Sequence, residues 1–278
     1  MSTFEDRVAS HSARPPAEVV EPAHVDAAAR ARTFTNRYEI KYPVEGSHLP
    51  EVKAALAEFL TPDSNGIHHG GIEGYYVHSI YFDSPDFQFL REKFEGNLVR
   101  VKPRIRSYRA STDGAPKGIF LELKGRYDRI VQKRRCPIDH SLAQALLTQS
   151  PVHPNGWSSK HSVLGEFQYM SHRLRLVPCV SVLYHRTAFF GTYWPDLRVT
   201  YDRLILCSPT TSLDAPSRDF TQATPCSRTI LELKYNDKLP RLLLNRLNSL
   251  GLQQRTFSKY AVSFERCFRN LNGAMSLH

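Results

Sequence analysis

The chain of 278 residues is 41% hydrophobic, which is enough apolar material for one sizeable core or at most two small ones. Its 37 Lys and Arg residues exceed its 27 Asp and Glu residues, and the net charge of +10 favours a polyanionic partner: a nucleic acid, a membrane surface or a phosphorylated small molecule. No stretch is long and apolar enough to span a bilayer, no secretory signal begins the chain, and none of the five cysteines forms a C-x-x-C pair. We therefore expect a cytoplasmic protein without a structural zinc ion. Such a protein could still dock on a membrane protein.

Residues 1–32 are rich in Ala, Pro, Glu and Arg without apolar periodicity, and they predict a disordered N-terminal tail. From residue 33 onward, period-two alternation predicts strands over 35–43, 75–82, 97–108, 118–126, 129–138, 178–190, 197–206 and 229–236. Helices are predicted over 49–60, 142–148, 165–175, 239–250 and 258–270, and loops over 151–159 and 208–227. Many strands and few helices in one domain, placed at 33–272 before a short tail at 273–278, indicate an α+β fold. We expect a closed antiparallel β-barrel tunnel of about eight strands with helices packed outside.

Long ionisable side chains recur on one face of several predicted strands. The members of this set are Arg37, Glu39, Lys41, Arg100, Lys102, Arg104, Arg106, Glu122, Lys124, Arg126, Arg198, Asp202, Glu232 and Lys234. For any single strand, the better interpretation is a solvated outer face whose apolar side forms the barrel core. Four successive basic positions on one strand face repel one another without a counter-anion, however. The set as a whole therefore favours a polar, basic lumen with the apolar faces turned outward under helices, and the planar Arg fork suits phosphate.

The pattern E-x-K occurs three times on these strands, in Glu39–Lys41, Glu122–Lys124 and Glu232–Lys234. A Lys places a positive charge on a phosphate oxygen, whereas a Glu can hold Mg²⁺ or Mn²⁺ through oxygen. The pattern is equally compatible with a Glu that acts only as charge partner of the neighbouring Lys. The constellation predicts a site for a chain of phosphates with a divalent metal.

Ten short segments, in their order and spacing, resemble a known family. They are R-Y-E-I-K-Y (37–42), S-I-Y-F-D-S-P-D (79–86), R-E-K-F-E-G (91–96), K-P-R-I-R-S-Y (102–108), F-L-E-L-K (120–124), Q-K-R-R (132–135), Y-H-R-T-A-F (184–189), R-V-T-Y-D (198–202), L-E-L-K (231–234) and F-S-K-Y (257–260). The chain resembles the catalytic domain of the vacuolar transporter chaperone (VTC) polyphosphate polymerase and its bacterial relatives. These belong to the triphosphate tunnel metalloenzymes, a CYTH-like superfamily.

The resemblance implies a β-barrel tunnel that binds a triphosphate or polyphosphate along its length and needs a divalent metal, often Mn²⁺. The residues that it places on phosphates are Lys41, Arg104, Arg106, Lys124, Arg186, Lys234 and Lys259. Glu232 would be the best metal ligand and take part in catalysis, with Glu39 and Glu122 as helpers. Arg91, Lys102, Arg198 and Ser258 are further phosphate-binding candidates. Of these, Ser258 begins a predicted helix, where free N–H groups favour anions.

By resemblance, the chain transfers the γ-phosphoryl group of ATP to a polyphosphate chain. The superfamily opens with E-x-E-x-K, and Arg37 replaces the first Glu here, which fits the polymerase branch better than the triphosphatase branch. One alternative is an inorganic or nucleoside triphosphatase, which would use the same site with water as acceptor. Another is a non-catalytic polyphosphate-binding module. We expect no nucleic acid as partner, because the basic residues lie on strand faces and the aromatics mostly in apolar runs. His185 should point away from Arg186 and is not a candidate for a phosphohistidine.

Overall fold

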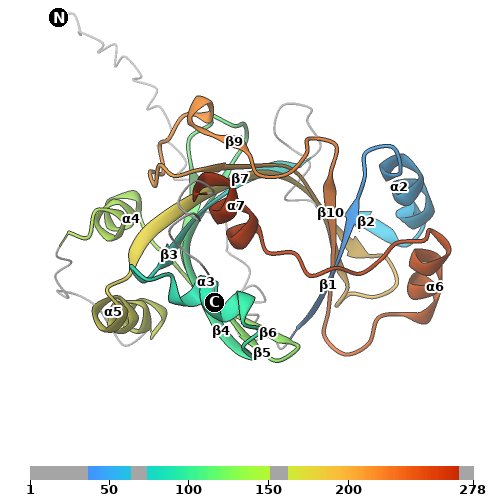
Figure 1. Ribbon diagram of the computed structural model, residues 1–278. Helices are drawn as coiled ribbons and strands as arrows, with labels where there is room; N and C mark the ends of the chain where they lie inside the picture. Colours follow the sequence, from blue (N-terminus) through green and yellow to red (C-terminus); the bar gives the residue numbers. More distant parts are fainter. Residues whose placement is uncertain (1–36, 64–73, 151–161, 269–278) are drawn as a thin grey trace, which may run out of the picture. The chain divides into compact units, whose positions relative to one another are not determined.

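The computed structural model describes residues 37–63, 74–150 and 162–268, which belong to one compact unit spanning 33–278. The core of this unit is a ten-stranded sheet in the order β1-β10-β8-β7-β3-β4-β5-β6, with β2 paired to β7 and β9 to β8 (Figure 1). Its strands are β1 (Tyr38–Val44), β2 (Leu60–Pro62), β3 (Tyr75–Asp83), β4 (Val99–Arg109), β5 (Lys117–Tyr127), β6 (Ile130–Pro137), β7 (Val177–Gly191), β8 (Arg198–Ser208), β9 (Thr221–Gln222) and β10 (Thr229–Tyr235). The helices are α2 (Leu49–Ala57), α3 (Gln88–Phe94), α4 (His140–Leu147), α5 (Ser162–Leu174), α6 (Arg241–Ser249), α7 (Lys259–Phe268) and the 3₁₀ turn η3 (Ser217–Asp219).

The α+β class and the eight strands expected from alternation are confirmed, and every paired strand is antiparallel. The tails expected at 1–32 and 273–278 and the loop expected at 151–159 lie outside the described residues. The short strands β2 and β9 and the helix α3 were not predicted. Two- and three-residue strands carry too few positions for alternation to be recognised.

The two ends of the strand order, β1 and β6, are not joined by a ladder. A single isolated antiparallel bridge pairs Arg37 with Val131. Further along β1, the carbonyl of Lys41 accepts a hydrogen bond from the backbone N–H of Arg255, in the segment between α6 and α7. The sheet is therefore not closed by a continuous hydrogen-bonded ladder, and the closed barrel expected from the sequence is not confirmed.

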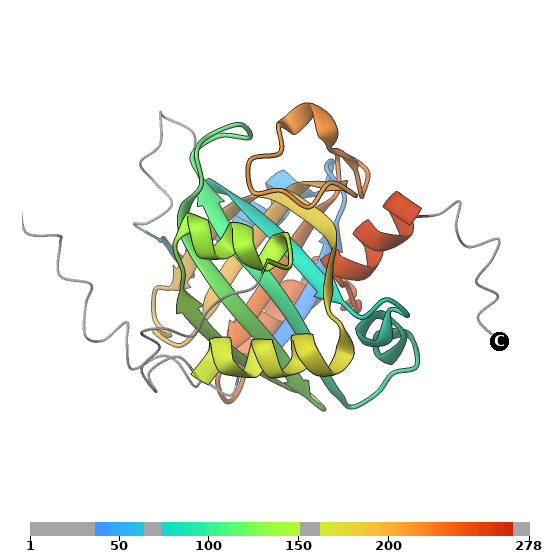
Figure 2. The ribbon, with the colours of Figure 1, turned by 90° about the vertical axis from the view of Figure 1, so that its left-hand side faces the viewer.

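Two apolar clusters cover the outer face of the sheet, and each contains a pair of helices. On one side α4 and α5 pack on β3 to β6, where Phe167 meets Phe82 and their cluster includes Ile105 and Leu121 (Figure 2). On the other side α2 and α6 pack on β1, β10 and β8, through a cluster that includes Leu56 and Leu247. Fully burying one such side chain stabilises the fold by about 1.5–3 kcal/mol. The apolar faces of the strands thus point outward under helices, as the sequence predicted.

The opposite, inner face of the sheet is partly apolar. Helix α7 packs on β7 and β8, and its Tyr260 and Phe264 belong to a cluster with Tyr81, Val182 and Tyr184. A lumen that is polar and basic throughout was therefore a wrong expectation for this part of the inner face. Because α7 occupies it, the charged residues are concentrated on the remaining part.

The unpredicted helix α3 begins at a buried carboxylate. Asp83, at the end of β3, accepts hydrogen bonds from the backbone N–H groups of Phe89 and Leu90 and, at 2.5 Å, from the hydroxyl of Tyr260 on α7. Ser84 Oγ accepts a further bond from Gln88 N. These acceptors satisfy amide groups that have no partner within the first turn. The D-S-P-D sequence is the signal that could have predicted this start.

Candidate functional site

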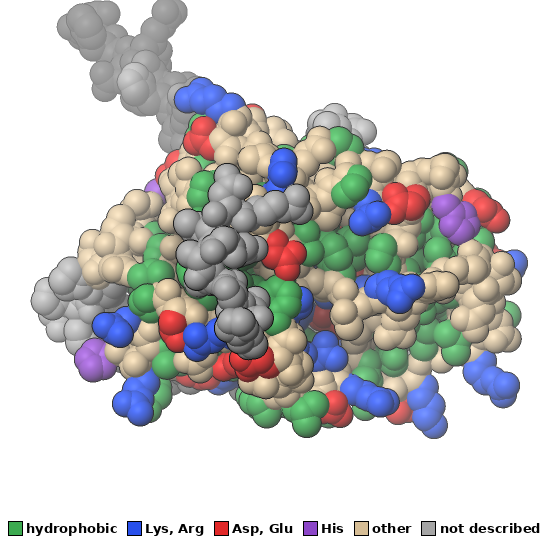
Figure 3. All heavy atoms as spheres, in the orientation of Figure 1, with side chains coloured by type: hydrophobic (Ala, Val, Ile, Leu, Met, Phe, Trp, Pro, Cys, Tyr) green, Lys and Arg blue, Asp and Glu red, His purple; other side chains and the backbone are tan. Residues whose placement is uncertain are grey.

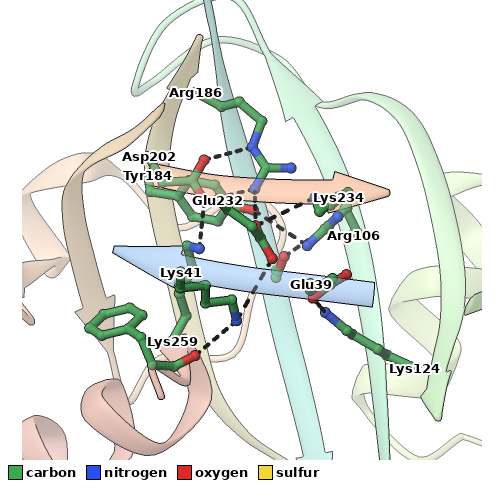
Figure 4. Close-up of polar contacts among 12 residues, drawn as sticks. Glu39, Lys41, Arg106, Lys124, Tyr184, Arg186, Asp202, Glu232, Lys234 and Lys259 are labelled. Carbon is green, nitrogen blue, oxygen red and sulfur yellow. Dashed lines mark hydrogen bonds and ion pairs between the residues drawn. The ribbon is translucent and has the colours of Figure 1, made fainter. Parts of the chain in front are cut away.

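The pairing of β1 with β10 places two E-x-K segments against each other. Glu39 lies opposite Lys234, and Lys41 lies opposite Glu232. Directly opposed residues of an antiparallel pair share one face, so the four side chains form a compact block of alternating charge. Figure 4 shows them converging with residues from other strands.

Glu232 lies at the centre of this block, with only 4% of its side chain exposed. Its carboxylate lies 3.4 Å from Lys234 Nζ, 3.5 Å from Arg186 Nη2 and 3.7 Å from Lys41 Nζ (Figure 4). Burial by itself raises the pKa of Glu232, but the charges of Lys234 and Lys41 outweigh burial and hold the pKa well below its ordinary value. Glu232 is therefore an anion shared among three cations, none of them at hydrogen-bond distance.

Asp202 on β8 binds cations from two other elements. Arg186 on β7 donates to both of its carboxylate oxygens, at 2.6 and 2.7 Å, and Lys259 Nζ from the first turn of α7 lies at 2.5 Å. On the same face of β8, Thr200 Oγ1 is buried without a hydrogen-bond partner among the described residues. Buried hydroxyls normally have a partner, so this one is an exception on the inner face.

Glu122 on β5 is the counter-ion of the basic strand β4. Arg104 donates to it from Nε at 2.9 Å, Lys133 on β6 lies at 2.6 Å, and Arg106 lies at 3.6 Å. The Glu122 side chain is fully buried. Both of its oxygens are engaged by close cations, which is the geometry of a structural ion pair.

Two further contacts bring predicted phosphate-binding residues together. Lys102 on β4 donates from Nζ to Ser258 Oγ at 2.8 Å, and Lys124 on β5 donates to Glu39 at 2.7 Å. Ser258 Oγ also accepts from the N–H of Ala261, at 3.4 Å, in the first turn of α7. The predicted position of Ser258 at a helix start is confirmed, and its hydroxyl is shared between the helix and a lysine.

Cations outnumber carboxylates in this cluster. The cations are Lys41, Lys102, Arg104, Arg106, Lys124, Lys133, Arg186, Lys234 and Lys259, and the carboxylates are Glu39, Glu122, Asp202 and Glu232. Burial lowers the pKa of Lys234 to about 7, of Lys133 to about 8, and of Lys102 well below its ordinary value. Because removal from water disfavours the ammonium form, an anionic ligand would favour the charged state of these lysines. We call this set of thirteen residues the charged cluster.

Two predicted residues lie apart from the charged cluster. Arg91 is on α3, with 45% of its side chain exposed, and pairs with Asp86. Arg198 is 32% exposed and pairs with the buried Asp63, although it shares the inner face of β8. No described hydrogen bond or ion pair joins either to the cluster, although Arg198 lies opposite Lys234 in the pairing of β8 with β10. Their roles on phosphate remain predictions. His185 accepts a hydrogen bond from Arg203, away from Arg186, as alternation predicted.

The sequence reasoning did not assign a role to several members of the site. Lys133 lies in the Q-K-R-R segment, and Asp202 alternates with Arg198 on β8, but neither was named as a functional residue. The hydroxyls of Tyr81 and Tyr184, which accept from Arg104 and Arg106, were also missed. Lys133 becomes recognisable only through the strand register, which places it directly opposite Lys124. No sequence pattern identifies the two tyrosines.

The four carboxylates of the charged cluster differ in how available their oxygens are as metal ligands. Among the described residues, no group of three or more His, Cys, Asp and Glu side chains is placed to hold an ion by itself. Burial and the nearby charge of Glu232 raise the pKa of Glu39, but Lys124 and other lysines outweigh them and hold this pKa below its ordinary value. Mg²⁺ is commonly held by one or two carboxylates together with substrate phosphates. Glu232 and Glu39 fit such a metal, whereas both oxygens of Glu122 are occupied.

The VTC-domain family profile matches residues 36–268. The chain belongs to the VTC-domain family. This membership supports a function in phosphoryl transfer from, or hydrolysis of, a triphosphate. No curated protein matches it significantly. Among the described residues of the VTC domain, no helix has the length and apolar character to cross a membrane.

Solved structures resemble the VTC domain at low identity. A candidate adenylate cyclase from Bacillus halodurans is 11% identical, with a TM-score of 0.49 over 81% of this chain and 95% of the other. The PH1819 protein from Pyrococcus horikoshii is 13% identical, with a TM-score of 0.44 over 83% and 99%. The capping-enzyme triphosphatase of Mimivirus is 10% identical, with a TM-score of 0.35 over 80% and 91%. We draw no conclusion about function from these three similarities.

Proposed function

We propose that this VTC domain is a metal-dependent phosphotransferase that moves the γ-phosphoryl group of ATP onto a polyphosphate chain. The observation that carries the proposal is the excess of cations in the charged cluster, nine against four carboxylates, with Arg104, Arg106 and Arg186 buried and the six lysines partly buried. Taking a cation out of water without a partner is costly, so an excess of this kind is kept for a polyanion that completes the charge balance. A chain of phosphates supplies several negative charges in a row.

The arginines and the lysines of the charged cluster have different roles in the proposed phosphoryl transfer. Arg186 and Arg106, each held at a tyrosine or a carboxylate, present planar donors to phosphate oxygens. Lys41, Lys234 and Lys259 place point charges around Glu232 and Asp202. In the transfer, an oxygen of the acceptor phosphate attacks the γ-phosphorus while the bond to the β–γ bridging oxygen breaks, and ADP leaves. A divalent metal, Mn²⁺ or Mg²⁺, held by Glu232 and Glu39 would neutralise charge on the transferred group.

The protonation states of the carboxylates favour a phosphate acceptor over water. Neighbouring cations overcome the effect of burial and hold the pKa of all four carboxylates of the cluster below ordinary values. A carboxylate with a lowered pKa is a poor general base, and water needs a base to become a nucleophile. A phosphate oxygen is already anionic and needs none. The same site is therefore better suited to chain extension than to hydrolysis.

The face of the molecule drawn in Figure 3 agrees with a small polyanion as ligand. On the face drawn in Figure 3, Lys and Arg side chains are scattered among hydrophobic and acidic ones. A nucleic-acid footprint is a continuous basic patch or stripe. We therefore propose ATP and inorganic polyphosphate, and no nucleic acid, as partners of the charged cluster.

The test is to incubate the purified chain with ATP and Mn²⁺, with and without a pyrophosphate primer, and to resolve the products by gel and ³¹P NMR. A lengthening phosphate ladder is expected, and it should be lost in Glu232→Gln and in the Arg104→Ala/Arg106→Ala double variant. Arg173→Ala, which removes an exposed cation on α5, is the matched control and should keep wild-type activity. Release of orthophosphate alone would assign the site to a triphosphatase. Polyphosphate binding without any turnover would leave a non-catalytic binding module.

A further inference from the structure

Three aromatic side chains lie beside the charged cluster on the inner face of the sheet. The ring centroids of Tyr75 and Tyr108 are 5.7 Å apart, and those of Tyr108 and Phe120 are 6.1 Å apart. Both contacts are edge-on, at 64° and 75°. Because the residues come from the neighbouring strands β3, β4 and β5, the rings follow one another across the sheet. We call these three residues the aromatic row.

The strand register places the aromatic row next to the guanidinium groups of the cluster. Tyr75 lies opposite Arg186 in the pairing of β3 with β7, and Phe120 lies opposite Arg106 in the pairing of β4 with β5. Burial raises the pKa of Tyr75, and the charges of Arg186 and Arg198 oppose that rise, so its hydroxyl lies within the field of both. A ligand whose phosphates contact Arg186 and Arg106 therefore has the aromatic row within reach of its other end.

The exposure of these rings separates them from the other tyrosines of the inner face. Tyr81 and Tyr184 are buried, and their hydroxyls accept hydrogen bonds from Arg104 and Arg106. Tyr75, Tyr108 and Phe120 are only partly buried. The guanidinium of Arg135 lies 4.5 Å from the centroid of Phe120. Partly exposed rings combined with a stacked Arg form a surface on which a flat heterocycle can stack.

We propose that the aromatic row stacks the nucleobase of a nucleoside triphosphate whose phosphates lie in the charged cluster. The inference rests on the proposed function and adds to it that the phosphoryl donor is bound through its base as well as its phosphates. The strength of stacking on tyrosine and phenylalanine depends on the ring area of the base and not on its hydrogen-bond donors and acceptors. The two purine nucleotides ATP and GTP should therefore bind almost equally.

The test compares two ligands on the same protein. Binding of the non-transferring analogue β,γ-imido-ATP and of inorganic triphosphate is measured by calorimetry with Mn²⁺, for the wild-type chain and for Tyr75→Leu and Tyr108→Leu. Loss of one stacked ring should weaken imido-ATP binding about 5- to 100-fold. Inorganic triphosphate, which has no base, should change by less than about twofold in the same variants. Tyr75→Phe and Tyr108→Phe keep the ring and should bind both ligands like wild type.

The outcomes separate this inference from the proposed function. Equal weakening of both ligands in the Leu variants, or no weakening of either, overturns base stacking and leaves the phosphate site standing. Failure of the wild-type chain to bind either ligand overturns both proposals. A second measurement needs no variant: the fluorescence of 2-aminopurine riboside triphosphate should be quenched on binding to wild type and restored by excess inorganic triphosphate. Binding without quenching would also overturn base stacking.

Discussion

Lys102 on β4 donates a hydrogen bond from Nζ to Ser258 Oγ at the start of α7, at 2.8 Å. The ammonium group lies in the field of Lys41, Lys124 and Arg100, and no ion pair to a carboxylate is found for it among the described residues. This contact joins the most basic strand to the helix that fills part of the inner face. It also leaves one cation of the site without an anionic partner in the free protein.

Replacing Lys102 should change the stability of the fold and the affinity for triphosphate in opposite directions. Lys102→Met removes an uncompensated charge, so the midpoint of thermal unfolding should rise, by about 2–4 °C for each kcal/mol gained. Triphosphate affinity should fall about tenfold or more, because a charged donor to phosphate is lost. Differential scanning calorimetry and titration with inorganic triphosphate measure the two effects. Lys102→Arg keeps the charge and is the control; a Met variant that binds as tightly as wild type would exclude Lys102 from the phosphate site.

The affinity for triphosphate should depend on pH through Lys234. Burial lowers the pKa of Lys234 to about 7, so the free protein holds this amine increasingly neutral above pH 7. A bound polyanion favours the ammonium form, so binding above pH 7 takes up a proton and affinity falls as the pH rises, by up to tenfold per unit for one proton. Calorimetry at pH 8 in buffers of different ionisation enthalpy counts the protons. Lys234→Arg should take up fewer, and an affinity that stays constant from pH 7 to 9 would contradict the prediction.

Removing the charge of Glu232 should reduce turnover without reducing binding. In Glu232→Gln the three surrounding cations lose their shared anion, so triphosphate should bind as tightly as in wild type or more tightly. The rate of ATP consumption should fall about 100-fold or more, because the group best placed to hold the metal is lost. Steady-state rates against Mn²⁺ concentration check this, with Glu39→Gln as the comparison, whose loss should be smaller. Wild-type turnover in Glu232→Gln would remove this residue from the chemistry.

Glu122 should prove to be a structural counter-ion. Its fully buried carboxylate balances Arg104, Arg106 and Lys133, so Glu122→Gln should destabilise the fold by about 3–5 kcal/mol. Saturating triphosphate should restore part of the lost stability, since a ligand that binds only the folded state stabilises it. Denaturant unfolding with and without ligand measures both.

The matched control for that prediction is Glu45→Gln. Glu45 pairs with Arg228 on the surface, with 53% of its side chain exposed, and its loss should cost less than about 1 kcal/mol. Equal destabilisation in the two variants would show that the ion pairs of Glu122 contribute no more than a surface pair.

Alternation alone located the eight longer strands and the charged face of several of them, because a side-chain period of two is a local property of an extended chain. The E-x-K segments of β1 and β10 and the K-x-R-x-R segment of β4 were recognisable for this reason. The D-S-P-D start of α3 was present in the sequence but was not recognised. Membership of the VTC-domain family was also readable, because it rests on short segments in a fixed order.

The tertiary structure decided which charged side chains pair with one another and whether the sheet closes into a barrel. Whether Glu122 serves a metal or three cations depends on which strands flank β5, and residues 122 and 133 share a contact only through their register. The placement of α7 on the inner face, the single bridge between Arg37 and Val131, and the aromatic row all join segments far apart in the chain. Each depends on long-range pairing that a local pattern does not encode. The sequence by itself therefore determined which residues are charged and which way they point, and the fold decided which of them meet.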